Sequence, residues 1–163
     1  LEDQYLGFGL NSSRSFREFK LLWQLHEEGF SAPRPVAALV EPHGIYYRAA
    51  LVTVRITDVE TLGHRLVRDG AEAVNWTALG HLIRQFHKRG VYHADLNVDN
   101  ILLDSENKMY LIDFDRASIR RTNLWKKSNI RRLLRSIKKI HQNDCDIYND
   151  RCWETFLIAY NSQ

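Results

Sequence analysis

Apolar residues recur at helical spacing near the start of the chain, over residues 15–28. Ser12 and Ser13 are candidate caps before this stretch, and Gly29 can end a helix after it. The apolar positions are Phe16, Phe19, Leu22, Trp23 and Leu25. Because this spacing gathers apolar side chains on one face, the pattern predicts an amphipathic helix.

The next segment has the short apolar runs and breakers that are typical of a β-hairpin. Residues 31–35, which include Pro33 and Pro35, interrupt the helical pattern. Strands are expected at residues 36–40 and at about residues 45–56, with residues 41–44 forming the turn between them.

Four further helices are predicted in the rest of the chain. Thr61 and Asn75 suit the caps of the first two, and the second of these should stop at Gly90. The apolar stripe of the second comprises Leu79, Ile83, Phe86 and His87. The last two helices are indicated by Ile130, Leu133, Leu134 and Ile137, and by Trp153, Phe156, Leu157 and Tyr160.

A second hairpin is predicted between these pairs of helices. Residues 101–103 and 109–112 are apolar, and the polar residues 104–108 join them. Such a hairpin returns the chain to its starting point. Residue 113, at the end of its second strand, should therefore lie beside residue 100, at the start of its first.

The residues that flank this hairpin carry the most specific chemistry in the chain. Residues 93–100 read His-Ala-Asp-Leu-Asn-Val-Asp-Asn, and residues 113–115 read Asp-Phe-Asp. In an H-x-D-x-x-x-x-N loop, the Asp takes the proton of an acceptor hydroxyl and the Asn holds a metal ion on the nucleotide phosphates. Asp95 and Asn100 fit these roles, and Asp113 would be a second oxygen ligand of Mg²⁺. The spacing predicts a kinase-type phosphotransferase that uses ATP.

Each part of this constellation also has a purely structural interpretation. A His-x-Asp pair is commonly only hydrogen-bonded, and an Asp-Phe-Asp can be a solvated turn. The hypothesis therefore depends on their occurring together with Asn100 and a hairpin of suitable length. We expect His93 to brace the loop backbone and not to transfer protons.

Composition is that of an ordinary soluble globular protein. The chain has 163 residues, of which 44% are hydrophobic and 26% are charged, enough for one domain or slightly more. No apolar run is long enough to cross a bilayer, and the amino end does not resemble a signal peptide. Cys145 and Cys152 are expected to be reduced, which fits the cytoplasm. Because its only methionine is Met109, the chain is expected to be a fragment.

The order of elements predicts an α+β fold of the protein-kinase-like, two-lobed type, with the amino-terminal part of the small lobe missing. A kinase small lobe begins with a glycine-rich loop and a strand Lys that pairs with a helix Glu. No Lys precedes Glu18, so Glu18 is either that helix Glu without its partner or an exposed residue. Gly7 and Gly9 lie directly before the helix, where we expect an ordinary turn.

We expect two lobes. Residues 1–56 would form the partial nucleotide-binding lobe and residues 57–163 the helical catalytic lobe. The small lobe should end in a hinge at residues 54–56, where Val54 and Ile56 would meet adenine. An ordinary strand end is the alternative for this segment.

Several stretches strongly resemble the Kdo kinases, which are part of the lipopolysaccharide core kinase family; Kdo is 3-deoxy-D-manno-octulosonic acid. They are Ser-Phe-Arg-Glu-Phe at 15–19, Pro-Arg-Pro-Val-Ala-Ala at 33–38, Gly-Ile-Tyr-Tyr-Arg-Ala at 44–49, Tyr-His-Ala-Asp-Leu-Asn at 92–97 and Leu-Ile-Asp-Phe-Asp-Arg at 111–116. The resemblance implies phosphorylation of the 4-hydroxyl of Kdo on a lipid A precursor. It also implies a peripheral location at the cytoplasmic face of the inner membrane of Gram-negative bacteria. Without the amino-terminal strands, the chain alone should have negligible turnover.

Positive charge is concentrated after the Asp-Phe-Asp, although the net charge is only +3. Residues 116–139 include many basic and no acidic residues. We expect Arg116, Arg120 and Arg121 to bind the acceptor's anionic groups, and the other cations to favour an anionic membrane surface over nucleic acid. The sequence indicates no oligomeric state.

Other classes of protein fit less well. Protein kinases usually have Arg before the catalytic Asp and an Ala-Pro-Glu after the metal-binding motif, whereas this chain has Ala94 and no such tripeptide. Aminoglycoside and choline kinases share the catalytic loop and remain the enzymatic alternative. A module that binds nucleic acid or an anionic membrane surface, through the basic stretch, is the non-enzymatic alternative.

Overall fold

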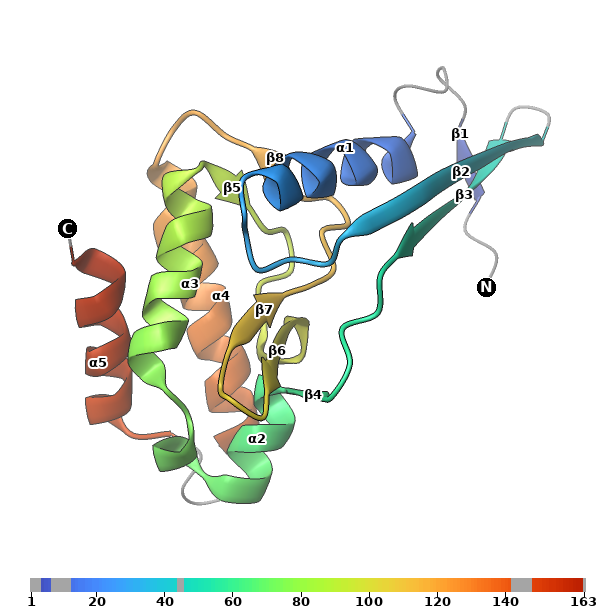
Figure 1. Cartoon of the computed structure of the whole chain (residues 1–163). Helices are drawn as coiled ribbons and strands as arrows, with labels where there is room; N and C mark the ends of the chain where they lie inside the picture. Colours follow the sequence, from blue (N-terminus) through green and yellow to red (C-terminus); the bar gives the residue numbers. More distant parts are fainter. Residues whose placement is uncertain (1–3, 7–12, 44–45, 142–147, 163) are drawn as a thin grey trace.

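The computed structural model describes residues 4–6, 13–43, 46–141 and 148–162, and its architecture is mixed α and β, as predicted (Figure 1). Gly7, Gly9, Ser12, Gly44 and Cys145 lie outside these ranges. The helices are α1 (Arg14–Glu27), α2 (Leu62–Asp69), α3 (Trp76–Lys88), α4 (Leu124–His141) and α5 (Asp150–Asn161). The strands are β1 (Gln4–Leu6), β2 (Pro35–His43), β3 (Tyr46–Thr53), β4 (Val59–Thr61), β5 (Val91–Tyr92), β6 (Ile101–Asp104), β7 (Met109–Leu111) and β8 (Ser118–Ile119).

Helix α1 lies along a three-stranded antiparallel sheet of order β1-β3-β2 (Figure 1). The Ser13 side chain caps α1 by accepting from the backbone N–H of Phe16 at 3.4 Å, and Gly29 has a φ of +75° just after the helix. Both signals were predicted. Leu22 and Leu25 are buried beneath the helix, whereas Trp23, which was assigned to the same face, is 46% exposed.

The predicted turn at residues 41–44 is wrong in its first three positions. Glu41, Pro42 and His43 continue β2 and pair with Arg48, Tyr47 and Tyr46 of β3. A proline inside a strand argues for a break, but β2 is an edge strand, where the missing N–H costs no ladder bond. The partner strand ends at Thr53, so residues 54–56 lie outside it.

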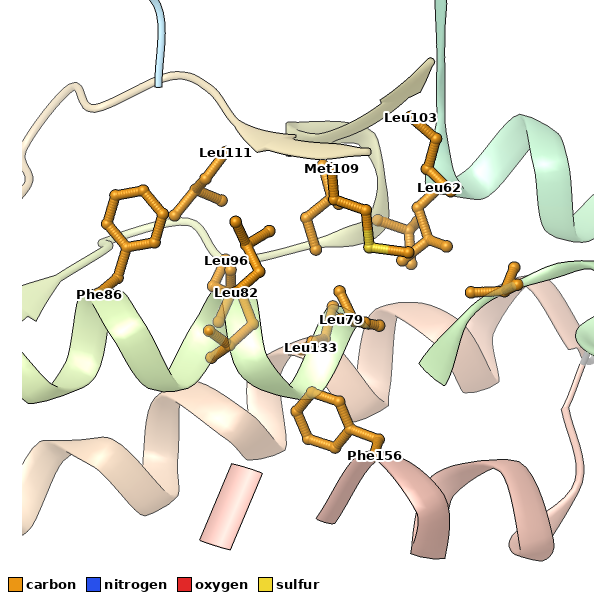
Figure 2. Close-up of a cluster of buried hydrophobic side chains, with 14 of the residues drawn as sticks. Leu62, Leu79, Leu82, Phe86, Leu96, Leu103, Met109, Leu111, Leu133 and Phe156 are labelled. Carbon is orange, nitrogen blue, oxygen red and sulfur yellow. The ribbon is translucent and has the colours of Figure 1, made fainter. Parts of the chain in front are cut away.

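In the carboxy-terminal part, α3 packs against the β6–β7 hairpin on one side and against α5 on the other, and Leu133 of α4 joins the same buried core (Figure 2). Thr61 and Asn75 cap α2 and α3 as predicted, and the predicted stripe of α3 is buried. Helices α3 and α5 come so close that a Cβ on Gly80 would lie 2.6 Å from the Phe156 carbonyl oxygen. In the described residues, no helix is both long and apolar enough to cross a membrane.

The second hairpin forms as predicted and gains a third strand. Strand β6 pairs with β7 on one side and with β4 on the other, and β4 was not predicted. The Leu111 N–H donates to the Ser31 carbonyl at 2.9 Å, which attaches this small sheet to the loop after α1. This bond brings the amino-terminal part alongside the catalytic loop.

Candidate active site

The catalytic loop and the Asp-Phe-Asp meet at the base of the second hairpin. The Ile112 N–H donates to the Asn100 carbonyl at 3.0 Å, so the residues that flank the hairpin are adjacent. His93 Nε2 donates to the Ile112 carbonyl at 2.9 Å, and burial lowers the pKa of the imidazole. His93 is therefore neutral and braces the loop, as expected.

Asp95 is exposed, and its neighbours fix its orientation. Asn97 Nδ2 donates to Asp95 Oδ2 at 3.0 Å. The Asn97 Oδ1 accepts from the backbone N–H groups of Asp99 and Asn100 at 2.8 and 3.0 Å, so Asn97 is itself held in place. The motif did not reveal this role of Asn97, because Asn97 occupies one of its unspecified positions. The result is a carboxylate oriented at the surface, as a general base requires.

Asn100 and Asp113 present the oxygens that were predicted to bind Mg²⁺. Asn100 Nδ2 donates to the Asp95 carbonyl at 2.9 Å, so the amide oxygen of Asn100 is the atom left to bind a cation. Asp113 has a φ of +61°, a left-handed conformation that Asp tolerates better than most residues. No cluster of three or more His, Cys, Asp or Glu side chains occurs in the described residues. One amide and one carboxylate oxygen nevertheless fit Mg²⁺, which keeps water and phosphate oxygens as its other ligands.

A cavity of about 440 Å³ connects Asp113 with the predicted hinge. Its lining includes Glu18, Thr53 and residues 54–56, and its apolar walls come from Leu22, Pro33, Leu51, Leu102, Ile112 and Phe114. The Val54 N–H donates to the Arg34 carbonyl at 2.8 Å, so this N–H is already used within the protein. Thus Glu18, Val54, Ile56 and Asp113, distant in sequence, line one cavity of a size typical for small ligands.

Glu18 lies half-buried in this cavity, and its electrostatic environment is unfavourable. Burial raises the pKa of its carboxyl group, and the negative charge of Asp113 raises it further. Arg14 and a hydrogen bond with the Phe114 backbone oppose the shift only in part. Because Glu18 is half-buried and lines the cavity, its interpretation as an exposed helix residue is wrong. A cation bound beside this carboxylate would stabilise its charged form.

Replacing Glu18 with Gln should raise Tm at pH 7 by a few degrees. A carboxyl group whose pKa is raised on folding stabilises the fold below the unfolded value of 4.5, and that contribution is lost as the pH rises through the folded pKa. The gain over wild type should therefore be small at pH 4 and grow towards pH 7. Thermal unfolding from pH 4 to 8 measures it, with Glu27→Gln, exposed on the same helix, as the control. A pH-independent gain would contradict this account of Glu18.

A second contact fixes α1 to the Asp-Phe-Asp. The Arg14 guanidinium forms a two-point ion pair with Asp115, and its Nε donates to Asp115 Oδ1 at 2.8 Å. Asp115 thus has a structural role that the sequence did not reveal. Together with the Glu18 contact to Phe114, this ion pair sets the position of α1 relative to Asp113.

Behind the loop, a chain of buried hydrogen bonds connects α5 to His93. Tyr160 and His87 Nδ1 are 2.7 Å apart, His87 Nε2 and Asn129 Oδ1 are 3.0 Å apart, and Asn129 Nδ2 donates to the His93 carbonyl at 2.7 Å. Burial lowers the pKa of His87 to about 4, so the ring is neutral. The bonds therefore run in one direction, with Tyr160 donating to His87 and His87 donating to Asn129.

Asn129→Asp should destabilise the protein by about 1–3 kcal/mol, because it replaces a buried donor with an acceptor that faces the His93 carbonyl. The substitution keeps the shape of the side chain, so the loss would report the hydrogen bond and not the packing. Urea unfolding measures the change. Asn123→Asp is the control, because Asn123 is exposed and lies directly before α4. Equal stability of Asn129→Asp and wild type would show that the chain of bonds is dispensable.

The basic residues predicted to bind the acceptor have different surroundings. The Arg120 guanidinium stacks 3.4 Å above the ring of Tyr92, and the side chain of Arg116 is 76% exposed near Asp115. Arg121 is exposed. The cation that contacts the expected base is instead Arg132 of α4, whose Nη1 lies 3.5 Å from Asp95 Oδ1. Nothing in the sequence distinguished Arg132 from the other cations of the basic stretch.

An oriented carboxylate, two oxygen ligands for a cation and an adjoining cavity are the parts of a phosphotransferase site. The family model for the lipopolysaccharide kinase (Kdo/WaaP) family matches residues 1–160. The chain therefore belongs to the lipopolysaccharide kinase (Kdo/WaaP) family, and the resemblance drawn from its motifs is confirmed.

Curated relatives agree with this assignment. The chain is 41% identical to the 3-deoxy-D-manno-octulosonic acid kinase of Xylella fastidiosa (strain M23) over 162 residues, which are 98% of this chain and 64% of that protein. It is 45% identical over 139 residues to the enzyme of the same name from Stenotrophomonas maltophilia (strain K279a), covering 85% of this chain and 55% of the relative. It is 35% identical over 163 residues to the enzyme of the same name from Vibrio vulnificus (strain YJ016), covering 100% of this chain and 69% of the relative. The chain thus spans less than two thirds of the Xylella and Stenotrophomonas proteins.

Proposed function

We propose that the protein transfers the γ-phosphoryl group of ATP to the 4-hydroxyl of Kdo on a lipid A precursor, in lipopolysaccharide core biosynthesis. The observation that carries this proposal is the bond from the Ile112 N–H to the Asn100 carbonyl, which makes Asp113 a neighbour of the catalytic loop. Family membership and the names of the relatives support the acceptor.

In this mechanism, Asp95 accepts the proton of the acceptor hydroxyl while Asn97 holds the carboxylate in position. Asn100 and Asp113 would hold Mg²⁺, which offsets the negative charge of the phosphates. The adenine would lie in the cavity near residues 54–56, and Glu18 would orient a cation that reaches the phosphates. Most of the catalysis would come from positioning and from charge stabilisation.

The proposal includes a two-lobed, protein-kinase-like arrangement with residues 1–56 in the small lobe and residues 57–163 in the helical lobe. The cavity between α1, the end of β3 and the Asp-Phe-Asp supports a nucleotide site between these parts. Because the proposed acceptor is a lipid, we further propose that the protein works at the cytoplasmic face of the inner membrane as a peripheral protein, with basic side chains of residues 116–139 near anionic headgroups.

The acceptor can be tested by incubating the complete protein with Mg²⁺, ATP and one of three acceptors: a Kdo-bearing lipid A precursor, an aminoglycoside or choline. We expect phosphate transfer to the Kdo lipid at a rate at least tenfold above the other two, with NMR placing the phosphate on the 4-hydroxyl. Faster transfer to the aminoglycoside or choline would leave a kinase with a different acceptor. Salt-dependent vesicle binding without phosphate transfer would favour the non-enzymatic module.

A further inference from the structure

Arg132 lies beside the proposed base although its position adds little to stability. Its Nη1 is 3.5 Å from Asp95 Oδ1, and the two side chains are 42% and 60% exposed. Ion pairs that are this exposed contribute about 0–1 kcal/mol. The placement of a guanidinium at this carboxylate therefore calls for a functional explanation.

The two oxygens of Asp95 have different partners. Oδ2 accepts a hydrogen bond from Asn97, whereas Oδ1 faces Arg132. The acceptor hydroxyl must come within about 3 Å of the carboxylate to give up its proton, and Oδ1 is the oxygen without a hydrogen-bond donor in the described structure. The acceptor consequently arrives next to the guanidinium of Arg132.

Arginine suits one class of acceptor at this place. Its planar guanidinium has five N–H donors in a fixed fork that matches the oxygens of a carboxylate or phosphate. Arg135 and Lys139, three and seven residues further on, lie on the same side of α4 as Arg132 and are exposed. A cationic acceptor would be repelled here, and a neutral one would gain no charge-assisted hydrogen bond.

We propose that Arg132 determines acceptor specificity by binding an anionic group, carboxylate or phosphate, that lies close to the reacting hydroxyl. This inference rests on the proposed function and deepens it by naming the residue that recognises the acceptor. The relatives are named for an acid, 3-deoxy-D-manno-octulosonic acid, whose carboxylate has the required chemistry. The basic stretch would then contain one residue that recognises the acceptor, whereas its other cations would attract anionic groups without specific contacts.

The experiment compares Arg132→Gln with Arg131→Gln in the complete protein, using ATP and the Kdo-bearing lipid. Both variants remove one positive charge from α4, and Arg131 is an exposed neighbour of Arg132. The long-range electrostatic attraction between the protein and an anionic acceptor should therefore fall equally in both. Arg132→Gln should raise KM for the Kdo lipid by about 10- to 100-fold, the effect of losing a hydrogen bond between charged groups. Arg131→Gln should change it by less than about threefold, and both variants should keep KM for ATP, because neither residue lines the nucleotide cavity.

Two modified acceptors identify the anionic group. The effect of Arg132→Gln should disappear with a methyl ester of the Kdo carboxylate if that group is bound, or with a dephosphorylated lipid if a phosphate is bound. The inference fails, while the proposed function stands, if wild type phosphorylates the Kdo lipid and Arg132→Gln either leaves KM for that lipid unchanged or raises KM for ATP by the same factor. If wild type phosphorylates a neutral or cationic acceptor and not the Kdo lipid, both fail.

Discussion

Replacing Asp95 with Asn should lower kcat by about 10²–10⁴-fold, the usual contribution of a general base. The amide has nearly the same shape and can still accept the hydrogen bond from Asn97, but it cannot take a proton from the acceptor. The nucleotide cavity does not include Asp95, so KM for ATP should stay within about twofold. Initial rates of the complete protein over a range of ATP concentrations measure both quantities.

Asp99→Asn is the matched control for this experiment. Asp99 is exposed in the same loop and loses the same charge, yet only its backbone N–H contacts Asn97. Its kcat should remain within a few-fold of wild type. A near-normal kcat for Asp95→Asn would remove Asp95 from the role of base, whereas an equal loss in both variants would indicate an effect of loop charge alone.

Local sequence signals predicted much of the fold because the interactions behind them are local. Ser13, Thr61 and Asn75 each accept a hydrogen bond from a backbone N–H three residues ahead, so each cap depends on a few neighbouring residues. The short strands β4, β5 and β8 were missed for the opposite reason. Strands of two or three residues carry no periodic pattern, and β4 exists because β6 offers it a free edge.

The candidate site divides in the same way. The sequence was sufficient to predict Asp95, Asn100 and Asp113, because one loop and one hairpin bring them together. Their proximity does not depend on how distant parts of the chain pack. Arg132 could not be found, since the docking of α4 on the catalytic loop decides which of many cations meets Asp95. The only sequence hint was Asn129, a polar residue between the apolar positions of α4, which proved to be the buried contact of that docking.

Replacing Asp113 with Asn should raise the Mg²⁺ concentration needed for half-maximal activity by at least about 10- to 100-fold. Loss of an outer-shell partner already costs about this much in metal affinity, and loss of a charged ligand should cost no less. Asn tolerates a positive φ as Asp does, so the left-handed backbone at this position is kept and the charge alone changes. Activity of the complete protein titrated with Mg²⁺ at saturating ATP measures the shift.

Asp115→Asn separates metal binding from helix docking, because it removes the same charge two residues further on. Asp115 is paired with Arg14, so its loss should loosen α1 and lower Tm while the Mg²⁺ midpoint stays within about twofold. Asp113→Asn should instead shift the Mg²⁺ midpoint without lowering Tm. The negative charge of Asp113 disfavours the charged form of the neighbouring Glu18, so removing that charge should stabilise the fold. If instead Asp113→Asn left the Mg²⁺ midpoint unchanged, the meeting of Asn100 and Asp113 at the base of the hairpin would have no role in metal binding.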